Sequence, residues 1–224
     1  MSNIDNILKS IKHLQPFPAA VQNALTQLMD PETPADKVIA AIQFDQALTA
    51  HVLRMCTRKI HSLKEALMRM GNRNMRMVIM AGSLLQFYTK EAEGYELRKG
   101  ELWKHSVACG FMSKILLGNM QRKMSLNIPE DSLFTTALIH DIGKVVLNEY
   151  VRDGFEEILN MMENQGCSFV EAEREIIGLD HAALGARICR FCNFPDEIAE
   201  DIAYHNEPEG CEKPLVHVTH LADL

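Results

Sequence analysis

The sequence predicts an all-α protein, a bundle of many helices, and two kinds of observation lead to this prediction. Apolar residues recur at helical spacing along most of the 224 residues, and helix-start signals precede several of these stretches. No convincing alternation of polar and apolar residues, and no Asn-Gly or Asp-Gly pair between such runs, indicates a β-hairpin. We therefore expect helices throughout the chain.

In the first part of the chain, three start signals define the elements. Thr33 can cap a helix that has Pro34 at its first position. Asp45 can cap the next apolar segment, and Ser62 and Glu65 have the spacing of a capping box. These signals and the apolar spacing predict helices over residues 3–13, 18–29, 34–43, 46–58, 63–70 and 73–90.

The second part of the chain has the same kinds of helix-start signal. Ser168 and Glu171 have capping-box spacing, and Asp180 can cap a helix that begins near His181. We predict helices over residues 97–118, 130–141, 151–165, 169–177, 181–192, 196–205 and 214–224. Charged residues and glycine interrupt the apolar pattern over residues 88–99. The sequence therefore predicts an N-terminal helical subdomain over residues 1–94 and a histidine-rich one over residues 95–224.

Composition excludes several classes of protein. A hydrophobic content of 47% and a mean hydropathy of -0.10 are ordinary for a globular protein. No apolar run reaches the roughly 18–20 residues that a membrane helix needs, and residues 1–5 lack the basic start of a secretory signal. The six cysteines are scattered, which favours a cytoplasmic protein with reduced thiols.

The net charge of -7 is distributed unevenly. Residues 1–95 carry 11 Lys/Arg and 8 Asp/Glu, whereas residues 96–224 carry 12 and 22. The acidic half suits cation binding and argues against nucleic acid as a partner. Residues 54–76 carry seven Lys/Arg against one acid, which indicates a solvated helix face or, as the alternative, phosphate or nucleic-acid contact.

The most informative motif is LIHDIGK at residues 138–144. It places the adjacent pair His140 and Asp141 at the end of an apolar helical run, where a carboxylate is costly unless it is paired or bound to a metal. Imidazole nitrogen and carboxylate oxygen are both ligands of divalent ions. The motif therefore predicts a metal site to which other histidines and acids contribute.

Further ligand candidates lie on or beside other predicted helices. Glu101 and His105 share one helix face at positions i and i+4. Any one histidine is more often structural or exposed than a ligand, but the His140-Asp141 pair reverses that balance. The full candidate set is Glu101, His105, His140, Asp141, His181, His205 and Asp223.

The segments around these candidates resemble those of a known protein family. The segment ALIHDIGK at residues 137–144 resembles the core motif of the HD superfamily of helical, metal-dependent phosphohydrolases. The wider sequence resembles HDOD domains, the HD-related output domains of bacterial signalling proteins. This second likeness rests on LQPFPAAV at 14–21, DQALTAHVLR at 45–54, the stretch 60–71, LWKHS at 102–106 and EAEREIIGLDH at 171–181. It spans residues 10–224 and implies an HD-like helical bundle.

The resemblance also implies roles for the candidates. His105, His140, Asp141, His181, His205 and Asp223 match positions at which HD and HD-GYP phosphodiesterases place metal ligands, and Glu101 matches a further acidic position. Asp141 is expected to bridge two divalent ions and Lys144 to meet a substrate phosphate, which makes these two the candidate catalytic residues. Tyr204 replaces the first of two adjacent histidines, and no Gly-Tyr-Pro follows, which argues against hydrolysis of cyclic di-GMP.

Three functions are compatible with this pattern. The first is a bacterial signalling domain that keeps an HD-type metal site and binds a signalling partner or a phosphorylated small molecule. The second is an active phosphohydrolase or phosphodiesterase acting on a nucleotide or cyclic nucleotide. The third is a helical scaffold without metal. For the first two, histidine and carboxylate ligands favour Fe, Mn or Zn over Ca.

Overall fold

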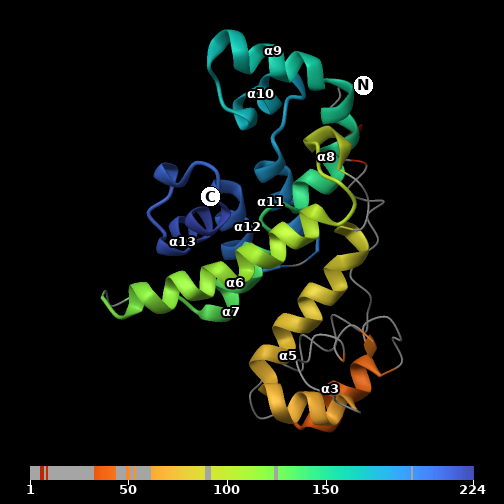
Figure 1. Ribbon diagram of the computed structural model, residues 1–224. Helices are drawn as coiled ribbons and strands as arrows, with labels where there is room; N and C mark the ends of the chain where they lie inside the picture. Colours follow the sequence, from red (N-terminus) through yellow and green to blue (C-terminus); the bar gives the residue numbers. More distant parts are fainter. Residues whose placement is uncertain are drawn as a thin grey trace. The chain divides into compact units, whose positions relative to one another are not determined.

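The computed structural model describes residues 6–7, 9, 33–43, 49–50, 53, 62–88, 92–123, 126–192 and 194–224 (Figure 1). Among these residues every regular element is a helix, apart from one isolated antiparallel bridge between Ala92 and Leu97. The all-α prediction is therefore confirmed. The Asp45 cap and most of the helices predicted over 3–13, 18–29 and 46–58 lie outside the described residues.

The chain divides into two compact units, Gln15–Gln86 and Met1–Leu14 with Phe87–Leu224. In the first, α3 (Ala35–Ile42) and residues 63–79 of α5 (Leu63–Tyr88) share an apolar core that includes Val38, Leu67 and Ile79. Gly71 breaks the helical geometry of α5 with φ 74°, where the sequence predicts a gap between two helices. Helix α3 begins one residue later than predicted, because Pro34 and not Thr33 is its N-cap.

The second unit holds the remaining described elements. They are η1 (Glu93–Tyr95), α6 (Glu101–Gln121), α7 (Glu130–Ile139), α8 (Ile142–Asp153), α9 (Phe155–Gln165), α10 (Phe169–Ile176), α11 (His181–Phe191), α12 (Asp196–Tyr204), η2 (Pro208–Gly210) and α13 (Pro214–Asp223). Helix α6 packs against α7 and α13, while α11 packs against α8 and α12 (Figure 1). None of the described helices combines the length and the apolar character needed to cross a membrane.

Two predicted helix starts are confirmed atom by atom. Ser168 and Glu171 form the complete capping box at the start of α10, each side chain bonding to the other residue's backbone N–H. At the start of α11 the Asp180 carboxylate accepts the Ala183 N–H at 2.7 Å. These caps fix the positions at which α10 and α11 begin.

The prediction missed the α-helix that follows the His140-Asp141 pair. The sequence predicts a helix over 130–141 and the next from 151, but α7 ends at Ile139, a turn holds His140 and Asp141, and α8 begins at once at Ile142. The start of α8 has no side-chain cap and contains Gly143, so local signals are weak. Burial stabilises the helix instead, since Leu147 and Val151 are fully buried.

Two glycines determine how closely α8 and α11 cross. A Cβ on Gly143 would overlap the His181 carbonyl group and crowd the Gly185 N–H. A Cβ on Gly185 would press on Ile202 and Ile142. This close crossing brings the turn that carries Asp141 next to the first residue of α11.

Candidate metal centre

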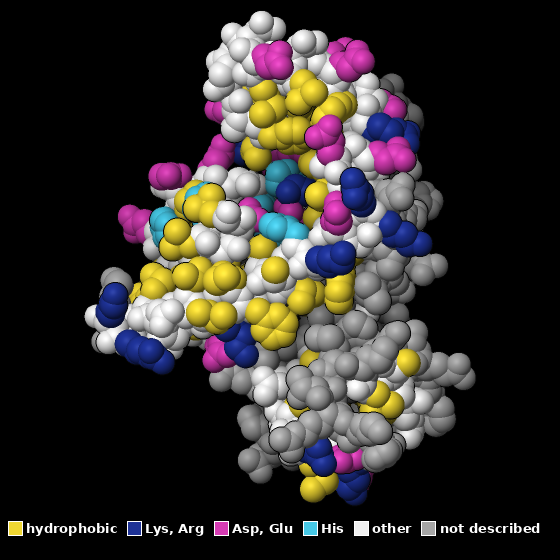
Figure 2. Space-filling view, viewed as in Figure 1, with side chains coloured by type: hydrophobic (Ala, Val, Ile, Leu, Met, Phe, Trp, Pro, Cys, Tyr) yellow, Lys and Arg dark blue, Asp and Glu magenta, His cyan; other side chains and the backbone are white. Residues whose placement is uncertain are grey.

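The structure brings six of the predicted ligands together in the second unit. Five of them lie at or beside helix ends, and the sixth, His105, lies within α6. The five are His140 and Asp141 between α7 and α8, His181 at the start of α11, His205 directly after α12, and Asp223 at the end of α13. Figure 2 shows histidine side chains near the middle of one face, beside acidic and basic ones. Convergence of this kind from distant parts of the sequence is what a metal site requires.

The Asp141 carboxylate lies at the centre and is fully buried. Its Oδ2 atom is 3.5 Å from His105 Nε2 and 3.4 Å from His140 Nε2. Its Oδ1 atom faces the other side, 3.5 Å from His181 Nε2 and 3.8 Å from His205 Nε2. Oδ1 is buried and has no hydrogen-bond partner among the described residues. A buried carboxylate oxygen in that state needs a compensating charge.

A second carboxylate completes one side of the cluster. Asp223 Oδ1 lies 2.9 Å from His105 Nε2 and 3.1 Å from His140 Nε2, and the two Nε2 atoms are 3.3 Å apart. Cys109 Sγ lies 3.6 Å from His105 Nε2. Two imidazole nitrogens and two carboxylate oxygens thus point at one small volume.

The outer nitrogens of three histidines are held by acceptors. Nδ1 of His140 donates to the Ala137 carbonyl at 2.8 Å, and Nδ1 of His205 donates to the Ile202 carbonyl at 2.7 Å. Nδ1 of His181 donates to Glu173 Oε2, also at 2.7 Å. Carbonyl and carboxylate oxygens only accept, so the proton is fixed on Nδ1. In the neutral ring the Nε2 lone pair then faces Asp141, which is the usual arrangement of metal-binding histidines.

Electrostatics at the centre favour a positive charge. Hydrogen bonds to Asp141 and Asp223 raise the pKa of His105 to about 12. Burial alone would lower the pKa of His140, but the same two carboxylates raise it to about 10. Burial would raise the pKa of Asp141, yet the Lys144 ammonium and the neighbouring rings hold it well below its usual range. A divalent cation bound here would supply the positive charge that these protons otherwise provide.

Lys144 brings a fixed positive charge to the cluster. Its Nζ atom lies 2.7 Å from Asp141 Oδ2 and 5.6 Å from the centre of the Tyr95 ring. Burial would lower the pKa of Lys144, but Asp141 outweighs burial and raises it. The side chain is therefore a charged group at the edge of the cluster.

Glu101 and Tyr204 are two further positions that the sequence analysis singles out. Glu101 Oε2 accepts the Arg98 backbone N–H at 2.8 Å at the start of α6, and its role as a ligand stays a prediction. Tyr204 is 38% exposed and its ring lies beside Gly210, whereas the next residue, His205, is fully buried in the cluster.

Sequence reasoning missed Glu173. It is fully buried, and its Oε2 atom accepts both the backbone N–H of His181 at 3.1 Å and the ring N–H at 2.7 Å. Its Oε1 atom accepts the Tyr95 hydroxyl at 2.5 Å. A signal was present, because Glu173 lies at helical spacing between Val170 in α10 and Ile177 directly after it, on an apolar stripe where an acid needs a partner.

Asn206 was missed as well. Its Nδ2 atom lies 2.9 Å from Nε2 of both His181 and His205 and donates to them. Burial lowers the pKa of His205 to about 3, with help from the positive charge of His140, so this ring is neutral and can accept. In the sequence, the only sign of these contacts is that Asn206 directly follows His205.

The donor set fits a metal. Groups of ligand atoms from His105, Cys109, His140 and Asp223, and from His140, Asp141 and His205, lie within 4.8 Å of one another. Nitrogen and carboxylate oxygen together suit Fe, Mn or Zn. The unpartnered Oδ1 atom of Asp141 is the buried polar atom that an ion on the His181 side would satisfy.

Comparison with known proteins bears on the family and the fold of the chain. The family model of the HDOD domain matches residues 14–208. A search of the curated proteins found no match. Among solved structures, a "putative phosphohydrolase" from Shewanella amazonensis SB2B aligns with a TM-score of 0.80 at 20% identity, covering 97% of this chain and 78% of that one.

Two further structures show the same fold. An HDOD domain protein with unknown function from Geobacter sulfurreducens aligns with a TM-score of 0.77 at 21% identity, covering 98% of this chain and 77% of the other. A "putative signal transduction protein" from Marinobacter aquaeolei VT8 aligns with a TM-score of 0.75 at 18% identity, covering 98% and 54%. At these identities the likeness establishes the fold alone.

Proposed function

The chain belongs to the HDOD domain family, and from this premise we propose that it is a bacterial signalling domain with an HD-type metal centre. In this proposal the centre holds two divalent ions, and the domain acts as a regulatory module. It binds a phosphorylated small molecule or a signalling partner. The free thiols of Cys109, Cys167, Cys189, Cys192 and Cys211 support a reducing, cytoplasmic setting.

The observation that carries the proposal is the two-sided environment of Asp141. Oδ2 shares one side with His105 and His140, and Oδ1 shares the other with His181 and His205. A carboxylate with separate imidazole nitrogens at each oxygen is suited to bridge two cations. Asp223 adds a ligand to the first side. Two carboxylates and four imidazoles favour Fe, Mn or Zn.

Two features of the second side favour regulation over turnover. Tyr204 lies beside Gly210 and adds no ligand where HD-GYP enzymes have a histidine. The Asn206 amide donates to both His181 and His205, so an ion there competes with those two hydrogen bonds. Weaker binding on the second side suits a ligand-responsive centre better than a permanent catalytic pair of ions.

The test begins with protein purified without added metal. Metal content is measured, and a panel of phosphomonoesters and phosphodiesters is then assayed with Mn²⁺ or Fe²⁺. The proposal predicts bound metal without turnover. Protein that takes up no metal would contradict it and would favour a metal-free scaffold, in which His140→Ala changes stability alone.

A phosphohydrolase is the second candidate, and the position of Lys144 favours it. The Lys144 ammonium lies 2.7 Å from Asp141 Oδ2, where it can meet a phosphate oxygen as a point charge. Bound metal would supply an activated water and would neutralise the phosphate charge. Turnover that is lost in both Asp141→Ala and Lys144→Ala would establish this function instead of regulation.

A further inference from the structure

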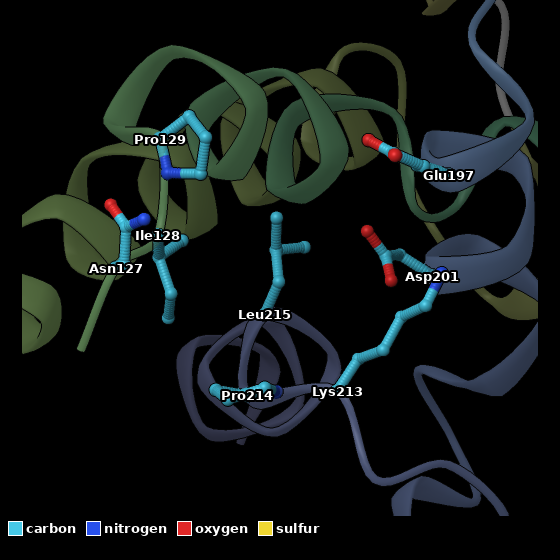
Figure 3. A pocket seen from close by; sticks show the side chains of 8 residues that line it. All are labelled: Asn127, Ile128, Pro129, Glu197, Asp201, Lys213, Pro214 and Leu215. Carbon is cyan, nitrogen blue, oxygen red and sulfur yellow. The ribbon is translucent and has the colours of Figure 1, made fainter.

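A pocket distinct from the metal centre lies between three other segments of the second unit. It has a volume of about 190 Å³ and is bounded by the segment before α7, by α12 and by the beginning of α13. Figure 3 shows the side chains that line it: Asn127, Ile128, Pro129, Glu197, Asp201, Lys213, Pro214 and Leu215. Its walls combine apolar side chains with charged ones, as ligand sites do.

Asp201 is the unusual group in this pocket. It is only 2% exposed, and its Oδ1 atom is buried without a hydrogen-bond partner among the described residues. Figure 3 shows its carboxylate between Glu197 and Lys213, on the inner side of the pocket. Burial raises the pKa of Asp201 to about 6, an effect that Lys213 opposes and that Glu200 and Glu197 reinforce. A buried acceptor without a partner costs stability that a ligand can recover.

The charges around the pocket favour a cation. The Lys213 ammonium donates to Glu200 Oε2 at 2.7 Å and so already has a carboxylate partner. Asp201 and the exposed Glu197 remain as the carboxylates that line the pocket. Ile128, Pro214 and Leu215 offer an apolar surface for an aliphatic chain.

We propose that this pocket binds a small organic cation, an alkylammonium or alkylguanidinium. The Asp201 carboxylate accepts the N–H groups of the cation, Glu197 adds a second negative charge at the entrance, and the apolar wall packs against the aliphatic part. This site is independent of the metal centre and of the proposed regulatory function. The volume suits a ligand of several non-hydrogen atoms.

The test uses n-butylammonium as the probe, with n-butanol as a neutral molecule of the same shape. Binding is followed by ligand-observed NMR and by the rise in melting temperature. We expect saturable binding of n-butylammonium with a Kd of about 1 mM and no saturable binding of n-butanol. Asp201→Asn should weaken binding about tenfold or more, because it removes a charge-assisted hydrogen bond.

Two further variants keep the test decisive. Glu197→Gln, an exposed change that should leave the fold intact, should weaken binding by a smaller factor, and Lys213→Met should strengthen it by removing a competing cation. The control Glu163→Gln removes an exposed carboxylate from α9 and should leave the Kd unchanged. The proposal is overturned if n-butanol binds as well, if Asp201→Asn binds with unchanged Kd, or if no saturation is reached at about 10 mM.

Discussion

The Glu173 carboxylate accepts both the backbone N–H and the ring N–H of His181, at 3.1 and 2.7 Å. One buried acid therefore sets both the start of α11 and the orientation of an imidazole in the candidate centre. The bond to Nδ1 leaves Nε2 to face Asp141. Glu173 acts on the centre through His181 and is a positioning residue.

We expect Glu173→Gln to weaken metal affinity by about 10- to 100-fold, because it replaces a charged acceptor behind a candidate metal-binding histidine. Competition between the protein and a chromophoric chelator for Zn²⁺ measures this affinity. The control is Glu175→Gln, an exposed change on the same helix. Equal affinity in Glu173→Gln and wild type would show that the Glu173–His181 pair serves only the fold.

Metal removal should change stability with a predictable sign. An ion that binds the folded chain raises the free energy of unfolding by about 2.7 kcal/mol when its free concentration is 100 times Kd. A chelator should therefore lower the melting temperature of wild-type protein. Asp141→Ala should melt at the same temperature with and without the chelator. If chelation also destabilises Asp141→Ala, the ion that matters is bound elsewhere.

Gly143→Ala should be strongly destabilising, since a Cβ there would overlap the His181 carbonyl where α8 and α11 cross. We expect a loss of about 3 kcal/mol or more in the free energy of unfolding, measured by urea denaturation. Gly118→Ala is the matched control, because its Cβ would meet nothing within 4 Å. That change, within α6, should stabilise the protein by about 0.5–1 kcal/mol. Similar effects in the two variants would refute the close crossing.

The buried Asp201 predicts a pH dependence of stability. Its pKa is about 6 in the folded protein and about 3.9 in an unfolded chain. The folded state therefore holds this proton to higher pH, and the contribution of Asp201 to stability falls as pH rises from about 4 to about 6. The charges that face it are Glu197, Glu200 and Lys213.

Asp201→Asn removes this loss. We expect the variant to match wild type near pH 4 and to exceed it by about 1–3 kcal/mol above pH 6. Urea denaturation of both proteins at each pH measures the difference, in which the other titrating groups cancel. A difference that stays constant from pH 4 to pH 7 would show that Asp201 ionises normally.

Much of this site was predictable from sequence because its main signal is local. His140 and Asp141 are adjacent and end an apolar run, so their cost in a core is visible without a structure. The gathering of His205 and Asp223 with them depended on a family resemblance, since contacts between distant helices leave no local pattern. Helix α8 was missed because burial rather than capping stabilises its first two turns.

The residues that support the candidate ligands were harder to predict than the candidate ligands themselves. Asn206 contacts His181, 25 positions earlier in the sequence, and His205, the residue directly before it. Asparagine after a helix is common for reasons unrelated to metal. Glu173 lies eight residues before His181, and its role depends on how α10 turns back onto α11. The carboxylate of Asp201 could not be assigned to a pocket before α7, α12 and α13 were placed together.

Anomalous diffraction from crystals of protein loaded with Mn²⁺ or Zn²⁺ would show where ions bind around Asp141. We expect anomalous peaks on both sides of the Asp141 carboxylate, one near His105, His140 and Asp223 and one near His181 and His205. The second peak should be the weaker, because Asn206 competes for its histidines. A map with no anomalous peak beside Asp141 would contradict the proposed metal centre.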